Sequence, residues 1–182
     1  MAEATTKPLY TRPWLWLIVV VAGAGVFYLI NKEPAPRLPV RQALVAVVHD
    51  ELGGTANWND APDRLRGFSL QARSDGDYLL WLYLRADHDD DKDRIRQRML
   101  RHAQILLEHL STDAAFDSIA IYRLTSFIRL PDEHGDPREV AAGRVVLTRE
   151  AAQQIHWKTL TTDDFEALVR AKGTLRFHSA LE

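Results

Sequence analysis

The segment YLLWLYLR, Tyr78–Arg85, decides the fold of this chain. A run of this length that is apolar at nearly every position is typical of a strand that lies in the middle of a sheet or is covered on both faces. The residues before it, Phe68–Arg73, alternate apolar and polar side chains, as in a half-buried strand. Asp75-Gly76-Asp77 supplies a turn between the two segments. Together they predict a β-hairpin.

A long amphipathic helix is expected after this hairpin. Its apolar stripe consists of Ile95, Met99, Ala103, Leu106 and Leu110, widened by Leu100 and Leu107. Beyond it, a second hairpin is expected, with strands Ser118–Leu130 and Val140–Thr148 joined by the polar loop PDEHGDP.

Shorter helices are expected at both ends of this region. They are Val40–Leu52, ended by Gly53-Gly54, then Arg149–His156 and Thr162–Ala171. Thr161 and Asp164 fit a capping box at the start of the last one. The order of elements predicts an α+β domain over residues 40–182. In it, antiparallel hairpins surround a long amphipathic helix, and the helices pack on one face of an antiparallel sheet.

A different kind of segment precedes this domain. WLWLIVVVAGAGVFYLI, residues 14–30, contains seventeen residues without a charge. As a helix it would span roughly 25 Å, near the lower limit for crossing a bilayer. Trp14 and Trp16 at one end and Tyr28 at the other suit the two membrane interfaces, and Gly23 and Gly25 would let another helix approach closely. We therefore expect a single transmembrane helix.

Two other interpretations of residues 14–30 are less favoured. A cleavable signal peptide would use the small residues Ala22 and Ala24, but cleavage there would leave five large apolar residues, 26–30, at the new terminus. A buried helix of a soluble domain would normally contain polar positions, and none interrupts this run.

The expected organisation is a tail (1–13), the transmembrane helix (14–30), a linker (31–39) and the domain (40–182). Pro34, Pro36 and Pro39 favour an extended linker. A short tail followed by a large domain favours a single-pass protein of a bacterial inner (cytoplasmic) membrane, with its domain on the periplasmic side. Basic residues flank both ends of the helix in nearly equal number, so they add little to this orientation.

Composition and motifs argue against several classes of function. Outside the first thirty residues, which hold Lys7, Arg12 and Glu3, 21 of the 23 basic and 24 of the 25 acidic residues remain, a net charge of −3. This balance does not favour nucleic acid as a partner. The chain has no cysteine, which excludes disulfides and thiolate sites. The common hydrolase, metalloprotease and nucleotide-binding motifs are missing, so we expect no enzymatic activity and no cofactor.

The acidic run DHDDDKD, Asp87–Asp93, is the candidate for a metal site. A calcium-binding loop that starts at Asp87 would need Gly at its sixth position and Glu at its twelfth, where this chain has Lys92 and Arg98. Carboxylates are also favoured at the amino end of a helix, where free N–H groups and the helix dipole attract negative charge. We therefore expect helix capping and no bound metal.

Two groups of residues are candidates for a partner interface. If alternate residues of Tyr78–Arg85 face the helices, then Leu79, Trp81 and Tyr83 point to the other face, where aromatic residues often mark a binding surface. The alternative is that the first helix of the domain or its carboxyl-terminal segment covers them. The second group lies on the outer face of the long helix and consists of Arg94, Arg98, Arg101 and Ile105.

These observations favour a non-catalytic accessory subunit of a larger membrane protein complex that serves energy conversion, secretion or transport. Its expected partners are the lipid bilayer and other integral membrane subunits. The alternative is a membrane-tethered sensor or ligand-binding module that acts as a monomer or homodimer, which predicts a closed apolar pocket with a few convergent polar groups.

Overall fold

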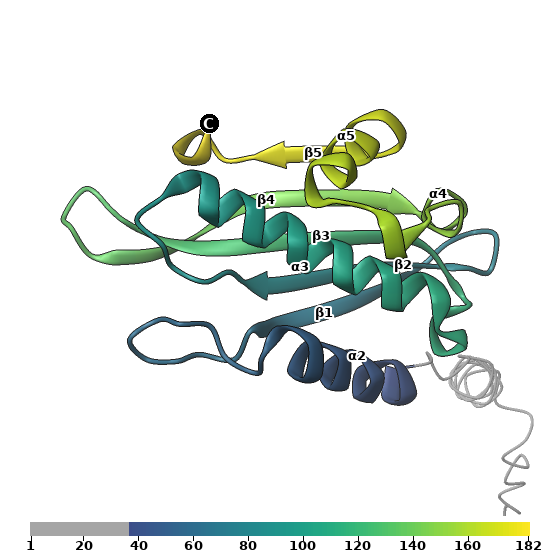
Figure 1. Cartoon of the computed structure of the whole chain (residues 1–182). Helices are drawn as coiled ribbons and strands as arrows, with labels where there is room; N and C mark the ends of the chain where they lie inside the picture. The colour runs from purple at the N-terminus through teal and green to yellow at the C-terminus, as the bar shows by residue number, and fades with distance from the viewer. Residues whose placement is uncertain (1–36) are drawn as a thin grey trace, which may run out of the picture. The chain divides into compact units, whose positions relative to one another are not determined.

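The computed structural model describes residues 37–182 (Figure 1). The strands are β1 (Leu65–Ala72), β2 (Tyr78–Arg85), β3 (Ile119–Pro131), β4 (Pro137–Thr148) and β5 (Thr174–Phe177). The α-helices of this part are α2 (Arg37–Leu52), α3 (Lys92–Thr112), α4 (Arg149–Gln153) and α5 (Thr162–Lys172). The strands form one sheet in the order β1-β2-β3-β4-β5.

The sheet is mixed, which corrects the expectation of an antiparallel one. The pairs β1–β2, β3–β4 and β4–β5 are antiparallel, but β2 and β3 are parallel. Helix α3 connects these two strands, and its 21 residues correspond to roughly 32 Å at about 1.5 Å per residue. The helix therefore returns the chain to the end of the sheet where β2 began, so that β3 runs in the same direction. The fold remains α+β, with two hairpins joined through a helical crossover.

The expected membrane-spanning helix is not part of the architecture that the structure describes. Within residues 37–182, no helix combines the length and the apolar character needed to cross a bilayer. The segment on which that expectation fell, residues 14–30, lies outside the described residues, together with Trp14, Trp16, Gly23, Gly25 and Tyr28.

The main core lies between the sheet and the helices. Helices α2, α3 and α5 lie on the same side of the sheet (Figure 1). The residues of this core that are at most 2% exposed include Leu44, Leu80, Leu82, Leu100, Leu106, Leu107, Leu110, Phe116, Tyr122, Leu124 and Phe165. The Tyr122 hydroxyl donates a hydrogen bond to the Leu110 carbonyl at 2.9 Å, which satisfies the polar end of this buried ring.

Helix α2 begins at Arg37, within the stretch 31–39 that was expected to be an extended linker. A proline is tolerated in the first turn of a helix because its missing N–H would have no partner there, so Pro39 does not prevent this start. Val40, Leu44, Val48 and Leu52 recur every four residues and are buried. Gly53, with φ of +76°, follows the last turn in a conformation that favours glycine.

Strand β5 was not expected from the sequence, because its alternation of polar and apolar residues extends over only four positions. It follows α5 directly through Gly173, and it pairs with β4 from Gly143 to Val146. A Cβ atom on Gly173 would lie 2.2 Å from the Val146 carbonyl oxygen and 3.1 Å from Leu147 Cδ1. The close approach of α5 to β4 therefore requires glycine at this position.

Replacing Gly173 by alanine is expected to lower the free energy of unfolding by about 1–3 kcal/mol, because the clash is with a backbone oxygen that no side-chain rotation relieves. Chemical denaturation of both proteins measures the difference. Gly67→Ala is the matched control, since a Cβ atom there has no heavy atom within 4 Å. Equal stability of the Gly173→Ala and Gly67→Ala variants would contradict this explanation.

Candidate partner-binding surface

Strand β2 sends its side chains alternately to the two faces of the sheet. Leu80, Leu82 and Leu84 are buried on the helix side, at 0%, 0% and 2% exposure. Trp81 and Tyr83, with Leu79, project from the other face and are partly exposed. The helices labelled in Figure 1 all lie on the side of the sheet to which these three leucines point, so they leave the second face uncovered.

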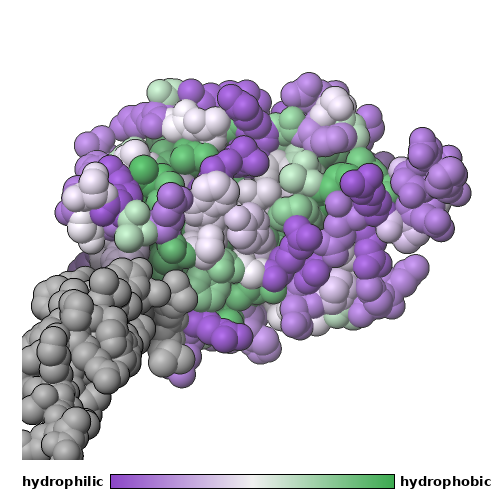
Figure 2. Space-filling model, turned by 180° about the vertical axis from the view of Figure 1, so that it is seen from behind, coloured by the Kyte–Doolittle hydropathy of each residue, from purple (hydrophilic) through white to green (hydrophobic). Residues whose placement is uncertain are grey.

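The uncovered face carries a cluster of three aromatic rings. The Trp81 and Tyr83 ring centroids are 6.5 Å apart, and the Tyr83 and Phe127 centroids are 6.3 Å apart. Arg123 of β3 lies next to Trp81 in the sheet. We call the surface made by Leu79, Trp81, Tyr83, Arg123 and Phe127 the open sheet face. Figure 2 shows the molecule from this side, with pale and green residues lying between strongly hydrophilic ones.

Arginine side chains stack on two of these rings. The Arg123 guanidinium carbon lies 3.9 Å from the Trp81 ring centroid, and that of Arg66 lies 4.1 Å from the Phe127 centroid. Arg66 is also paired with Glu139 at 3.2 Å. Within the described residues Arg123 has no carboxylate partner within 4.0 Å. The open sheet face therefore combines flat apolar area with a cation whose charge no carboxylate of residues 37–182 neutralises.

Two hydrogen-bond donors on this surface lack an acceptor within the described residues. They are Trp81 Nε1 and Arg123 Nε, and both atoms are shielded by neighbouring side chains. Buried donors in native proteins almost always find an acceptor. Both donors therefore remain without a hydrogen bond in the described part of the chain.

The second predicted group lies elsewhere. Arg94, Arg98, Arg101 and Ile105 belong to α3, in the helix layer, so the structure does not bring them together with Trp81. Arg94 and Arg98 are each paired with a carboxylate of the preceding loop, at 3.5 and 3.0 Å. Ile105 was expected on the outer face of the helix, but it is partly buried and packs against the main core. These pairings make α3 a weaker candidate for an interface than the open sheet face.

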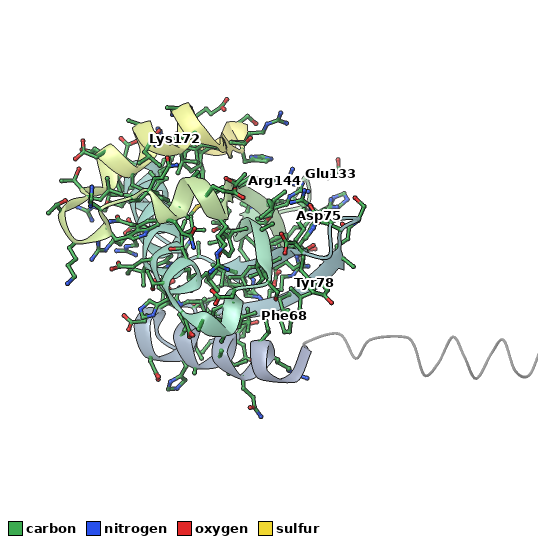
Figure 3. The ribbon with its side chains drawn as sticks, turned by 90° about the vertical axis from the view of Figure 1, so that its right-hand side faces the viewer. Phe68, Asp75, Tyr78, Glu133, Arg144 and Lys172 are labelled. Carbon is green, nitrogen blue, oxygen red and sulfur yellow. The ribbon has the colours of Figure 1, made fainter. Side chains whose placement is uncertain are left out.

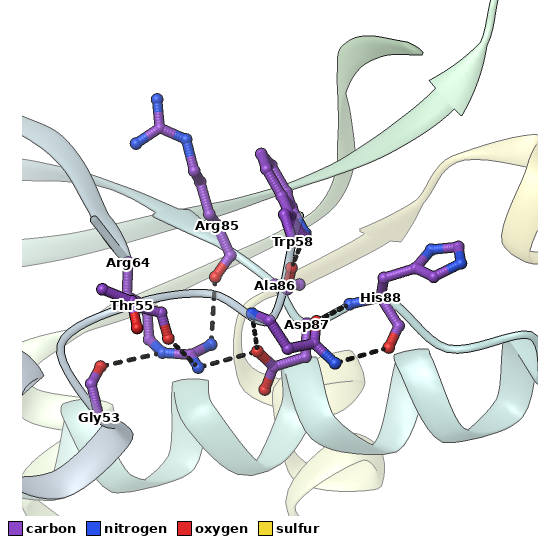
Figure 4. A network of polar contacts seen from close by, with 9 residues as sticks. Gly53, Thr55, Trp58, Arg64, Arg85, Ala86, Asp87 and His88 are labelled. Carbon is purple, nitrogen blue, oxygen red and sulfur yellow. Dashed lines mark hydrogen bonds and ion pairs between the residues drawn. The ribbon is translucent and has the colours of Figure 1, made fainter. Parts of the chain in front are cut away.

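A buried polar network holds one end of the sheet, and the sequence did not indicate it (Figure 4). Arg64 is 5% exposed. Its guanidinium donates to the carbonyls of Gly53 (3.1 Å), Thr55 (2.8 Å) and Arg85 (3.3 Å), and to Asp87 Oδ1 (2.9 Å). One side chain therefore joins the end of α2, the following loop and the end of β2.

The loop before β1 adds further bonds to this network. The Asn57 N–H donates to Asp87 Oδ1 at 3.0 Å, and the Asn57 side chain exchanges hydrogen bonds with the backbone of His88 at 3.0 and 2.6 Å. The Trp58 indole donates to the Ala86 carbonyl at 2.8 Å. Every partner here is a structural group of the same chain, so the network stabilises the fold. The bonds from Arg64 to Asp87 and from Trp58 to Ala86 join residues 23 and 28 apart in the chain, and no local pattern reveals such contacts.

The carboxylates of the acidic run, Asp87–Asp93, interact with several different groups of the domain. Burial raises the pKa of the Asp87 carboxyl, but the hydrogen bonds from Arg64 and Asn57 outweigh this effect, so that its pKa is lowered overall. Asp89 pairs with Arg98 at 3.0 Å. Asp91 caps α3 by accepting hydrogen bonds from the N–H groups of Asp93 and Arg94, the second and third residues of the helix. In residues 37–182, the structure shows no group of three or more side chains suited to holding a metal ion.

His102 lies beneath this network, on α3. Burial lowers the pKa of His102 to about 4, and the nearby charges of Arg64 and Arg98 act in the same direction, whereas Asp87 opposes them. Because the folded state disfavours the protonated ring, the unfolded chain binds the proton more readily. The free energy of unfolding therefore falls as the pH drops from about 6.5 towards 4.

Replacing His102 by glutamine is expected to remove this pH dependence. The wild-type protein should lose about 2–3 kcal/mol between pH 7 and pH 4.5 through this residue alone. Denaturation curves at the two pH values measure the loss, with His134→Gln, at an exposed hairpin tip, as the control. If His102→Gln loses as much stability as the wild type, the assignment to His102 is wrong.

The structure offers no closed pocket of the kind that a ligand-binding module requires, within the cavities identified in its described part. A cavity of about 290 Å³ lies where the loop at Asn57–Asn59 meets the tip of the β3–β4 hairpin. Arg129, which lines this cavity, already donates two hydrogen bonds to Asp60, at 2.9 and 2.7 Å. A larger cavity, of about 620 Å³, lies along the surface of α2 at Arg41, Val45 and His49 and is open to solvent.

Comparisons of this chain with protein-family models, with curated proteins and with solved structures find no match.

Proposed function

We propose that this chain is a non-catalytic accessory subunit of a larger protein assembly and that its domain docks onto another subunit through the open sheet face. The observation that carries the proposal is the aromatic cluster Trp81–Tyr83–Phe127, stacked with arginine and uncovered by any described helix. Tryptophan, tyrosine and arginine are the residues most enriched among those that dominate binding energy in protein interfaces.

The rigidity of this surface supports docking. Its side chains stand on the neighbouring strands β2 and β3 of a sheet whose other face is packed in the main core. A partner that binds here meets side chains already held in place, so little conformational entropy is lost on binding.

The membrane part of the expected function is a prediction from residues 14–30, which lie outside the described residues. The docking proposal does not depend on it. If the partner is an integral membrane subunit, as the sequence favours, the open sheet face is the surface of this domain that we expect it to contact.

Gentle extraction of the full-length chain from its native host, followed by sizing and mass spectrometry, tests this function. The expected result is one or more other proteins at fixed stoichiometry with this chain. A lone monomer or homodimer under conditions that preserve known assemblies of the same host would contradict the proposal.

A further inference from the structure

Besides Arg123, two more arginines of the sheet lack a carboxylate partner within the described residues. Arg144 of β4 and Arg176 of β5 are directly opposite each other across the two antiparallel strands. Neither forms an ion pair within residues 37–182, whereas Arg66 and Arg85 of the same sheet face are both paired with Glu139, at 3.2 and 3.1 Å. Like charges in directly opposed positions destabilise a sheet. A nearby anion would remove this repulsion.

The two arginines border a hollow of about 210 Å³. Arg144 projects from the sheet on the side away from the helices, since both of its neighbours in β4, Gly143 and Val145, face the helix layer (Figure 3). The Arg144 Nε–H is buried and has no acceptor within the described residues. Thr125, which pairs with Arg144 across β3 and β4, places a side chain that is 4% exposed at the floor of the hollow.

The remaining polar side chain in the lining is His178. Its Nδ1 accepts a hydrogen bond from the Ala180 N–H at 3.1 Å, so the neutral ring carries its proton on Nε2 and can donate there. The lining contains no carboxylate. The lining of the hollow therefore includes two guanidinium groups, a hydroxyl and an imidazole N–H, which are all hydrogen-bond donors.

We propose that this hollow binds the phosphate group of a free phosphate ion or of a phosphate monoester. A phosphate carries about −1.5 to −2 charges at neutral pH and presents at least three acceptor oxygens. It can neutralise both guanidinium groups and accept from several donors at once. A single carboxylate has one charge and two oxygens, and it would leave one of the two arginines unneutralised. This inference goes beyond the docking proposal and does not require a protein partner.

Calorimetric titration of the full-length chain with inorganic phosphate, phenyl phosphate and acetate, at constant ionic strength, tests the site. Both phosphates should bind, and acetate should bind at least about 10-fold more weakly. Tighter binding of phenyl phosphate would assign the site to an organic monoester, and equal binding would assign it to the free ion; both results support the proposal.

Variants identify the residues involved. Arg144→Gln and Arg176→Gln should each weaken phosphate binding by at least about 10-fold, because each removes a charge-assisted contact. Arg138→Gln is the matched control: it is an exposed arginine of the same strand, β4, and it forms no ion pair in the described residues. Without phosphate, Arg144→Gln should unfold at the same or a higher denaturant concentration than the wild type, since it relieves the repulsion with Arg176.

Three results would overturn the proposal: no binding of either phosphate at about ten millimolar, acetate binding as strong as phosphate binding, or phosphate binding that survives both substitutions. Failure of this site is distinguishable from failure of the docking function. Trp81→Ser should retain phosphate binding, and Arg144→Gln can be examined separately for co-purification with other subunits.

Discussion

Replacing Arg64 by alanine is expected to lower the free energy of unfolding by about 3–5 kcal/mol. The substitution leaves the Asp87 carboxylate without its charged partner in a partly buried site, and three backbone carbonyls lose their donor at the same time. A domain of this size is typically stable by about 5–15 kcal/mol, so the loss is a large fraction of the total. Urea denaturation of the full-length wild type and variant measures it.

Two further variants separate the contributions of Arg64. Arg64→Lys keeps a positive charge near Asp87 but cannot form the fork of bonds to Gly53, Thr55 and Arg85, so it should lie between the wild type and Arg64→Ala. Arg73→Ala removes an exposed ion pair with Asp75 and should change stability by less than about 1 kcal/mol. If Arg64→Ala is no more destabilising than Arg73→Ala, the network does not hold this end of the sheet.

Replacing Trp81 by serine is expected to weaken binding to the partner subunit by about 30-fold or more, which corresponds to at least 2 kcal/mol. The indole supplies the largest apolar surface of the open sheet face, and it is the platform on which Arg123 stacks. Co-purification of the partner with the tagged variant, compared with the tagged wild type, measures the effect.

Two controls separate loss of binding from loss of folding. The circular dichroism spectrum and unfolding midpoint of Trp81→Ser should remain close to those of the wild type, since the ring is partly exposed and lies outside the main core. Val45→Ser removes an exposed apolar side chain, at 48% exposure, from α2 in the helix layer, and it should retain the partner. Loss of folding in Trp81→Ser would show that the residue belongs to the core, and retention of the partner would exclude it from the interface.

Local patterns predicted the individual elements well. The apolar run Tyr78–Arg85 forms strand β2 with these bounds, the long stripe forms α3, and the Thr161–Asp164 capping box is present with a hydrogen bond of 3.1 Å. Each of these features depends on residues close together in the chain, where spacing and hydrogen-bonding chemistry act directly.

Relations between distant elements were harder to predict. The parallel pairing of β2 with β3 depends on the direction in which α3 returns, which the hydrophobic period of the strands does not encode. Strand β5 has four residues and gains its place from pairing with β4, not from its own sequence.

The candidate site was predictable in part. The alternation along β2 indicated which side chains point away from the helices. Whether another element covers these side chains depends on where α2 and α5 pack, which the alternation does not encode. Arg123, Arg144 and Arg176 come from three strands, and only the register of the sheet shows that their side chains lie on one face. Ile105 was placed on the wrong side because its neighbours on the helix are charged, although the core extends around that part of α3.

Site-specific photocrosslinking in the native host tests the docking surface most directly. A photoreactive amino acid at position 81 should give a crosslink to one defined partner protein, and the same group at position 45, on α2, should not. Crosslinks to that partner from position 45 but not from position 81 would contradict the account, because they would place the interface on the helix layer.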